Sequence, residues 1–179
     1  GSFNAEKGVN TPDLQDGALT PVKWVNNTLQ TTTADDPEWY SYTTTDKKWA
    51  NAQTKDGSLW VWIPRYAYQI SSNYHSNSTS GGTINIKFMK GTTNEAADGT
   101  STWSNSSGQG NWNIHPGFNY SSTASGLWVA KFEASQSDAG ANAANYQNYT
   151  GGTSGVIKIQ AGVNSWRNIT IDTMYTKCL

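Results

Sequence analysis

Charged side chains and cysteine are scarce in this chain. Lys, Arg, Asp and Glu make up 14% of the 179 residues, the net charge is -1, and Cys178 is the single cysteine. One cysteine excludes both an internal disulfide framework and a zinc site built on several thiolates. The low charge, with only two arginines, removes the electrostatic basis for binding nucleic acid, which we exclude as a partner.

Long apolar runs are also missing. No stretch approaches the roughly 20 residues that a membrane-spanning helix needs, so we expect no membrane contact. The chain opens on Gly1-Ser2, which looks like a cloning scar, and it shows no signal peptide. Any native targeting segment would therefore have been removed.

Aromatic and small polar residues fill the gap. Gly, Ser, Thr and Asn occupy 76 of 179 positions, and Trp, Tyr and Phe account for 12%. Disordered chains lack such an aromatic content, so the sequence predicts a folded, strand-rich α+β body with an uncharged surface of hydroxyls and amides. This composition is typical of extracellular β proteins, and we expect an extracellular, cell-surface or virion location.

Two segments have clear strand patterns near the middle of the chain. Residues 59–63 (LWVWI) are apolar at every position, which predicts a strand buried on both faces that ends at Pro64. Residues 84–90 (INIKFMK) alternate, which places Ile84, Ile86 and Phe88 on a core face.

The C-terminal half adds two strands and a helix. Residues 127–134 predict a strand with Trp128, Ala130 and Phe132 inward, and residues 156–160 predict a short one. Apolar residues spaced i, i+3, i+4 and i+7 predict a final helix that begins after an N-cap at Thr170. The residues of that stripe are Ile171, Met174, Tyr175 and Cys178. The helix has no C-cap, so we expect the native polypeptide to continue.

The pattern along the chain predicts an arm and a single domain. Residues 1–22 are polar, contain turn formers, and are expected to form an extended arm or linker. Residues 23–179 are expected to form one domain, incomplete at its C-terminus. Residues 91–126 lack periodicity and are rich in Gly, Ser, Asn and Thr, which indicates an insertion or a binding loop.

Catalytic patterns are thin. The two histidines, His75 and His115, lie in loop-like sequence, and no nucleophile elbow, Walker loop or GxGxxG pattern is present. Glu38 and Glu133 could supply the carboxylate pair of a glycosidase, but Glu133 is more simply an outward, solvated residue. We therefore predict that the chain is not an enzyme and name no catalytic residue.

An acidic cluster at Asp35, Asp36 and Glu38 is a weak calcium candidate, because Ca²⁺ prefers oxygen ligands. Acidic residues also favour helix N-termini, and this alternative explains the same cluster. We expect no other metal or cofactor.

Aromatic residues in the polar loops are the best candidates for binding. An aromatic face rimmed by amides and hydroxyls suits sugar stacking and protein hot spots, although the same rings can instead anchor a long loop. The candidate ligand-binding residues are Trp103, Trp112, Asn111, Asn113, Tyr146 and Tyr149.

Three segments resemble a known family. They are DGSLWVWIPRY (56–66), GLWVAKFEAS (126–135), and SWRNI (165–169) running into MYTKC (174–178). In this order they resemble the first half of a formylglycine-generating-enzyme-like domain, a variant of the C-type-lectin fold.

Two further blocks narrow the resemblance. KGVNTP (7–12) and the aromatic block over 39–52 are similar to surface and prepilin-type proteins of Gram-positive gut bacteria and to tail-associated proteins of their phages. The second half of the family's domain, with its ligand-facing loops and active-site cysteines, has no counterpart here. Cys178 matches a helix cysteine interpreted as core.

The resemblance implies a non-enzymatic adhesion or assembly module, a pilin-like subunit or phage tail component. Its partners would be copies of itself, or a cell-surface glycan or protein receptor. Two alternatives stay open at this point. One is a purely structural, self-assembling filament or virion subunit, and the other is an oxidase or hydrolase on the same scaffold.

Overall fold

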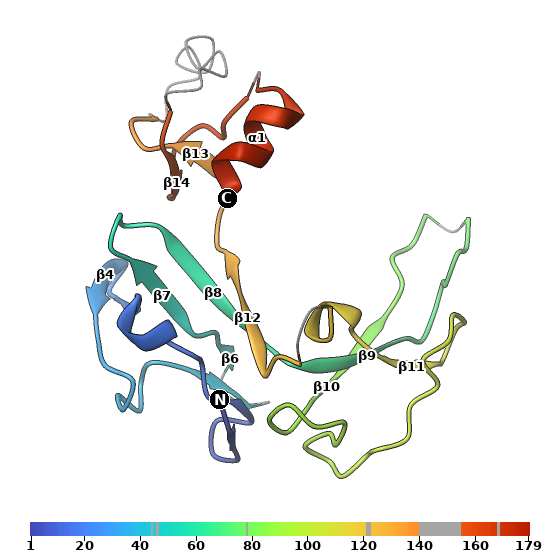
Figure 1. Ribbon diagram of the computed structural model, residues 1–179. Helices are drawn as coiled ribbons and strands as arrows, with labels where there is room; N and C mark the ends of the chain where they lie inside the picture. Colours follow the sequence, from blue (N-terminus) through green and yellow to red (C-terminus); the bar gives the residue numbers. More distant parts are fainter. Residues whose placement is uncertain (44, 46, 78, 121–122, 140–154, 168) are drawn as a thin grey trace. The chain divides into compact units, whose positions relative to one another are not determined.

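The computed structural model of residues 1–179 describes the chain except for residues 44, 46, 78, 121–122, 140–154 and 168. The described part is strand-rich, with five small sheets and a short helix at its C-terminal end (Figure 1). The prediction of a strand-rich body with a short C-terminal helix is therefore confirmed.

Two compact units make up the chain. The first contains 1–13, 40–50 and 62–127, and the second contains 14–39, 51–61 and 128–179. The expected arm over 1–22 and single domain over 23–179 stay a prediction. Residues 1–22 include β1 (Phe3–Asn4), β2 (Val9–Asn10), a 3-10 turn (Gln15–Gly17) and the start of β3.

The expected arm is tied down by contacts that a local pattern does not reveal. Val9 and Asn10 are fully buried. The Asn10 amide nitrogen donates to the carbonyls of Gly91 and Ser125, both at 2.8 Å. The indole nitrogen of Trp62 in turn donates to the Asn10 carbonyl at 3.1 Å.

The largest sheet has the strand order β12-β8-β7-β3-β4. Its strands are β3 (Leu19–Val25), β4 (Thr28–Thr31), β7 (Asn51–Thr54), β8 (Leu59–Pro64) and β12 (Gly126–Ala130). β7 pairs antiparallel with both β3 and β8. Figure 1 shows β8 between β7 and β12.

The predicted apolar strand is β8. Leu59 and Trp62 are buried and no residue of the strand is exposed, as expected for a strand inside a sheet. The strand ends at Pro64, and β9 (Tyr66–Ile70) begins two residues later in a different sheet. Pro64, which lacks an N–H, therefore marks the change of sheet, as predicted.

The next predicted strand is divided in two. Trp128 and Ala130 of β12 are half-buried while Leu127 and Val129 are exposed, so the predicted alternation is confirmed. The strand ends at Ala130, and β13 (Ala134–Gln136) pairs instead with β14 (Ile157–Ile159). β14 is the short strand predicted over 156–160.

In the first unit, a three-stranded sheet of order β10-β9-β11 combines β9 with β10 (Ile84–Phe88) and β11 (Trp112–Ile114). Two hairpins accompany it, β1–β2 and β5–β6 (Ser41–Tyr42 and Lys47–Lys48). A 3-10 turn (Pro116–Phe118) follows β11 and buries Phe118. Trp62, Ala67, Met89 and Phe118 form much of the core of this unit.

The orientation predicted for β10 is wrong. Ile84 and Ile86 are 62% and 52% exposed, and Phe88 is half-buried. The alternation is real, but β10 is an edge strand and the described residues place no layer over this end of its apolar face. A period of two identifies a face without showing what covers it.

The C-terminal helix, α1, runs from Ile171 to Cys178. Its predicted N-cap is confirmed, because the Thr170 hydroxyl accepts a hydrogen bond from the Thr173 N–H at 3.2 Å. The expected core position of Cys178 is wrong, since Cys178 is exposed. None of the helix residues is buried, and Ile171 is 85% exposed.

Candidate functional site

The site is built on one face of the β10-β9-β11 sheet. In antiparallel strands, residues directly opposite each other share a face. The register therefore places Tyr68 of β9 between Ile86 and Asn113, and Ile70 beside Ile84. One face of this small sheet thus combines a phenol, aliphatic side chains and an amide.

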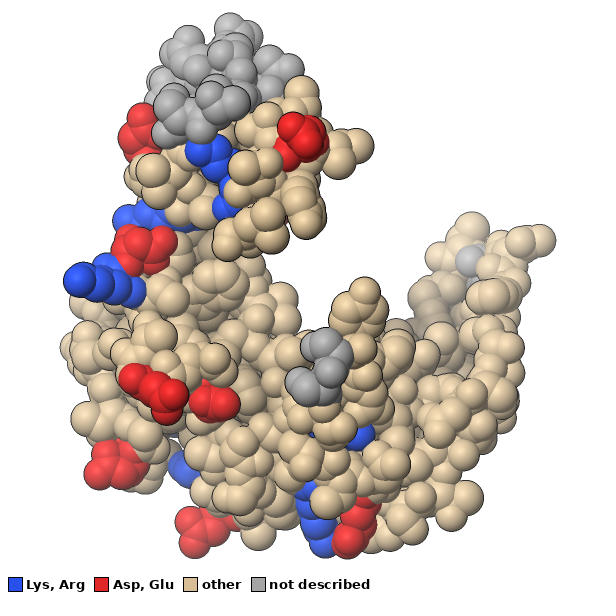
Figure 2. Space-filling view, in the orientation of Figure 1, with Lys and Arg blue, Asp and Glu red and all other residues tan. Residues whose placement is uncertain are grey.

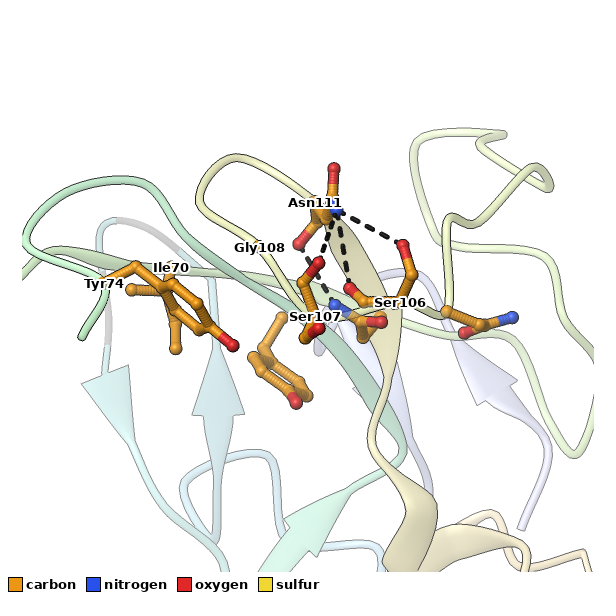
Figure 3. Close-up of a pocket in the computed structure, with 9 residues that line it drawn as sticks. Ile70, Tyr74, Ser106, Ser107, Gly108 and Asn111 are labelled. Atoms are coloured by element: carbon orange, nitrogen blue, oxygen red, sulfur yellow. Dashed lines mark hydrogen bonds between the residues drawn. The ribbon is translucent and has the colours of Figure 1, made fainter.

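A hollow of about 210 Å³ opens on this face. Residues from β9, from the loop after it, from the loop before β11 and from β11 itself line the hollow. They are Tyr68, Ile70, Tyr74, Asn105, Ser106, Ser107, Gly108, Asn111 and Asn113. Figure 3 shows Tyr74 and Ile70 on one side and the group of Asn111, Ser106 and Ser107 on the other.

Hydrogen bonds fix the polar wall of the hollow. The Asn111 amide nitrogen donates to the Ser107 carbonyl at 3.2 Å and to the Ser106 hydroxyl at 3.3 Å (Figure 3). The Asn113 amide nitrogen donates to the Asn111 carbonyl at 3.3 Å, and Asn105 accepts from the Ile114 N–H at 3.2 Å. The wall is therefore held by its own amides.

Several polar groups of the lining remain available to a ligand. Within the described part of the chain, no hydrogen bond occupies the Tyr68 and Tyr74 hydroxyls or the side-chain oxygens of Asn111 and Asn113. Tyr68 and Tyr74 are both half-buried, so their rings are partly accessible. The hollow thus offers aromatic surface together with hydrogen-bond acceptors and hydroxyl donors.

No charged side chain of the described residues lines the hollow. Residues 66–86 and 99–130 contain no Lys, Arg, Asp or Glu, and every residue that lines the hollow lies in these two stretches. Figure 2 shows that the acidic and basic side chains are sparse on the visible face, most of which is tan. The chemistry of the hollow is therefore stacking and neutral hydrogen bonding.

The candidate residues from the sequence divide between several places. Asn111 and Asn113 line the hollow. Trp112, which lies between them on β11, points to the opposite face of the sheet, where the Lys87 Nζ is 4.6 Å from its ring centroid. Tyr146 and Tyr149 lie outside the described residues.

Trp103 also lies away from the hollow. Its indole nitrogen donates to the Asn94 carbonyl at 2.8 Å, and the ring is half-buried. This contact is the one expected from the alternative that the ring anchors a long loop.

Sequence reasoning missed the aromatic side of the hollow. Tyr68 and Ile70 follow the recognised β8 pattern directly, and the alternation Tyr66, Tyr68, Ile70 is the signal that indicates their shared face. Tyr74 gives no comparable signal, because its position depends on the loop after β9.

Among the residues that the structure describes, neither histidine is paired with a nucleophile. The His75 ring stacks on Tyr74 with centroids 4.1 Å apart. The His115 Nδ1 accepts from the Gly117 N–H at 3.2 Å, and its ring lies against Tyr66 and Phe118. These contacts give His115 a capping role at the turn that follows β11.

The acidic cluster forms a turn. Asp36 bonds to Lys23 Nζ at 2.6 Å, to the Thr32 hydroxyl and to the Glu38 N–H at 2.8 Å. These bonds, Lys23 and Thr32 first, hold the pKa of Asp36 well below its usual range. Across the described residues, no group of three His, Cys, Asp or Glu side chains could hold a metal ion.

A second, smaller hollow lies in the other unit beside α1. It measures about 70 Å³ and is lined by Ala134, Ile157, Trp166, Ile169, Met174, Lys177 and Cys178. The Trp166 indole nitrogen is buried there without a hydrogen-bond partner in the described chain. This apolar hollow presents fewer polar groups than the one at β11.

No family model matches the chain, and no curated protein or solved structure does. The resemblance to formylglycine-generating-enzyme-like domains therefore stays a prediction. No helix among the described residues is long and apolar enough to cross a membrane.

Proposed function

We propose that this chain is a non-catalytic, externally displayed adhesion module that binds a neutral saccharide in the hollow beside β11. The observation that carries the proposal is the lining itself, in which Tyr68 and Tyr74 meet a wall of asparagine and serine side chains without any charge. Saccharides present apolar C–H faces and a ring of hydroxyls, and the hollow offers a partner for each.

The electrostatics favour a neutral ligand over a charged one. A phosphate or carboxylate ligand would leave its charge unpaired in the hollow, because Lys and Arg are absent from both stretches of chain that line it. A sugar hydroxyl, by contrast, donates to the Asn111 and Asn113 oxygens and accepts from the tyrosine hydroxyls at no such cost.

The scaffold belongs to the same proposal. We propose a variant of the C-type-lectin fold, as in formylglycine-generating-enzyme-like domains, displayed on a cell surface or virion. The strand-rich architecture, the long polar loops that carry the hollow and the low surface charge support this proposal. A pilin-like subunit or a phage tail component would use the hollow to recognise a cell-surface glycan.

A glycan array followed by calorimetric titration tests the proposal. We expect binding to neutral oligosaccharides, with Tyr68→Ala and Asn113→Ala each weakening it by about tenfold or more. Trp112→Ala is the matched control, because it changes the neighbouring residue on the opposite face of the sheet. Each variant must retain the melting temperature of the parent to within a few degrees.

The Trp112→Ala control also distinguishes the hollow from a site that includes Trp112, which the sequence alone had suggested. If Trp112→Ala abolishes binding while Tyr68→Ala and Asn113→Ala leave it intact, the hollow is not the site. An array without any bound glycan overturns the proposed function.

A further inference from the structure

The outer edge of β10 has no neighbouring strand among the described residues at Ile84 and Ile86, and we call these residues the open stretch. β10 has β9 as its only strand neighbour among the described residues. The Ser71 N–H donates to the Thr83 carbonyl at 2.9 Å, so Ser71 and Thr83 form a hydrogen-bonded pair of the β9–β10 ladder. Because bonding alternates along an antiparallel strand, the N–H and C=O groups of Ile84 and Ile86 point away from β9.

The other edge of this sheet is closed. The Ser104 N–H donates to the Trp112 carbonyl at 3.0 Å, and the Asn105 side chain accepts from the Ile114 N–H at 3.2 Å. The segment before β11 thus bonds to one outward backbone group of Trp112 and to one of Ile114. No comparable cover lies over Ile84 and Ile86 in the described chain.

The open stretch is also apolar. Ile84 and Ile86 are 62% and 52% exposed, and their side chains lie on one face with Ile70 and Tyr68. Natural edge strands are usually protected by lysine, proline or a bulge. In β10 the single charge, Lys87, lies beyond the open stretch and bonds to Asp98 at 3.1 Å.

We propose that β10 pairs with β10 of a second copy of this chain, antiparallel and about a two-fold axis at Asn85. In this register Ile84 lies opposite the partner's Ile86, and Asn85 lies opposite its own counterpart. All outward backbone groups of the open stretch then find partners, as in β-augmentation.

The strand is self-complementary in this register. Four isoleucines meet on one face, and Lys87 lies opposite Thr83 rather than opposite another charge. A register centred on Ile86 would need the Phe88 carbonyl, which already accepts from the Ala97 N–H at 2.8 Å. The occupied Phe88 carbonyl therefore favours the register centred on Asn85 over the one centred on Ile86.

The pairing has a consequence for binding, which rests on the proposed function. A two-fold axis at an antiparallel strand pair stands perpendicular to the sheet, so both copies present the same face. The two three-stranded sheets become one six-stranded sheet, with a hollow from each copy on its common face. The dimer is bivalent for a surface that displays many glycans, which raises its avidity.

Sedimentation velocity over about a hundredfold range of concentration tests the association. We expect a reversible monomer–dimer equilibrium, because the paired stretch is short. The double variant Ile84→Lys/Ile86→Lys places like charges opposite each other, and should weaken the dimer at least about tenfold. Ile171→Lys is the control, since it places the same charge at an exposed isoleucine on α1, away from β10.

Disulfide trapping tests the register without disturbing the backbone. In a Cys178→Ser background, Asn85→Cys places two cysteines at a non-hydrogen-bonded pair, where Cα atoms lie about 4.5 Å apart and a disulfide can close. We expect a disulfide-linked dimer that a reducing agent separates on a denaturing gel. Thr83→Cys is the control, because its counterpart lies four residue pairs away along the ladder.

The outcomes separate the two proposals. A monomer at every concentration, or trapping as efficient at Thr83→Cys as at Asn85→Cys, overturns the pairing even if the chain binds glycans. A trapped dimer that binds no glycan leaves the pairing intact and overturns only the proposed function.

Discussion

At the scale of single residues, Arg65 is a buried cation held by uncharged oxygen atoms. Its guanidinium donates to the carbonyls of Thr93 (3.0 Å) and Phe118 (3.3 Å), and to the side-chain oxygens of Asn94 (3.0 Å) and Asn119 (2.9 Å). Burial lowers the pKa of Arg65, but an arginine stays charged. These four bonds compensate for its desolvation.

We expect Arg65→Met to lower the free energy of unfolding by about 3 kcal/mol, because four acceptors, one of them the buried Phe118 carbonyl, lose their donor at once. Arg65→Lys should recover part of this loss, since an ammonium restores the charge but not the geometry of the fork. Urea unfolding measures both, with exposed Lys55→Ala as the control. Equal stability of Arg65→Met and the parent would contradict the argument.

A second residue, Asp98, gives the stability a pH dependence. Hydrogen bonds from Thr100, with help from Lys87 at 3.1 Å, lower the pKa of Asp98 to about 2. Because the folded pKa lies below the unfolded value, the stabilisation is complete above about pH 4 and is lost as the pH falls through about 2.

Asp98→Asn should therefore reduce the loss of stability between pH 4 and pH 2, relative to the parent. The free energy of unfolding in urea, measured at steps of pH, checks this expectation. Glu6→Gln, which changes an exposed carboxylate without a hydrogen bond in the described chain, should leave the profile unchanged. A steeper acid loss in Asp98→Asn would show that the sign is wrong.

At the scale of elements, the sequence predicted the features that depend on interactions between neighbouring residues. The apolar run of β8, the alternation of β12 and the capped start of α1 are visible in the sequence, because each depends on neighbouring residues. The exposure of Ile84 and Ile86 and the burial of Val9 depend on distant segments, and no period encodes them.

In the candidate site, too, some features follow from neighbouring residues and others depend on distant segments. Asn111 and Asn113 could be selected from composition, because amides beside aromatic residues suggest a binding loop. Their separation from Trp112 follows only from the strand β11, which sends neighbouring side chains to opposite faces. Tyr74 enters the hollow through a loop whose path the sequence does not specify.

The helix α1 provides a prediction at the same scale. It has eight residues and none of them is buried, so its N-cap carries a large share of its stability. Thr170→Ala should cost about 1 kcal/mol and reduce helical chemical shifts over 171–178, whereas Thr170→Ser should not. Thr176→Ala is the control, because the Thr176 hydroxyl bonds to the Asp172 carbonyl within the helix. Unchanged shifts in Thr170→Ala would contradict the role of the cap.

At the scale of the whole molecule, low charge sets how the proposed binding responds to salt. The net charge is -1, and charged residues are absent from both stretches that line the hollow. We expect the Kd for a neutral oligosaccharide to change less than about twofold between about 0.05 and about 0.5 M NaCl. Calorimetric titration measures this. A strong weakening with salt would indicate a charged ligand.

The same uncharged stretches also decide how proteases meet this molecule. Trypsin-like enzymes cleave after lysine or arginine, and the chain has none between Arg65 and Lys87 or between Lys90 and Lys131. Every residue that lines the hollow lies within these two intervals. Proteases of this specificity therefore find no cleavable bond among the residues that line the hollow. Footprinting by tryptic mapping will report on the hollow through only two large peptides.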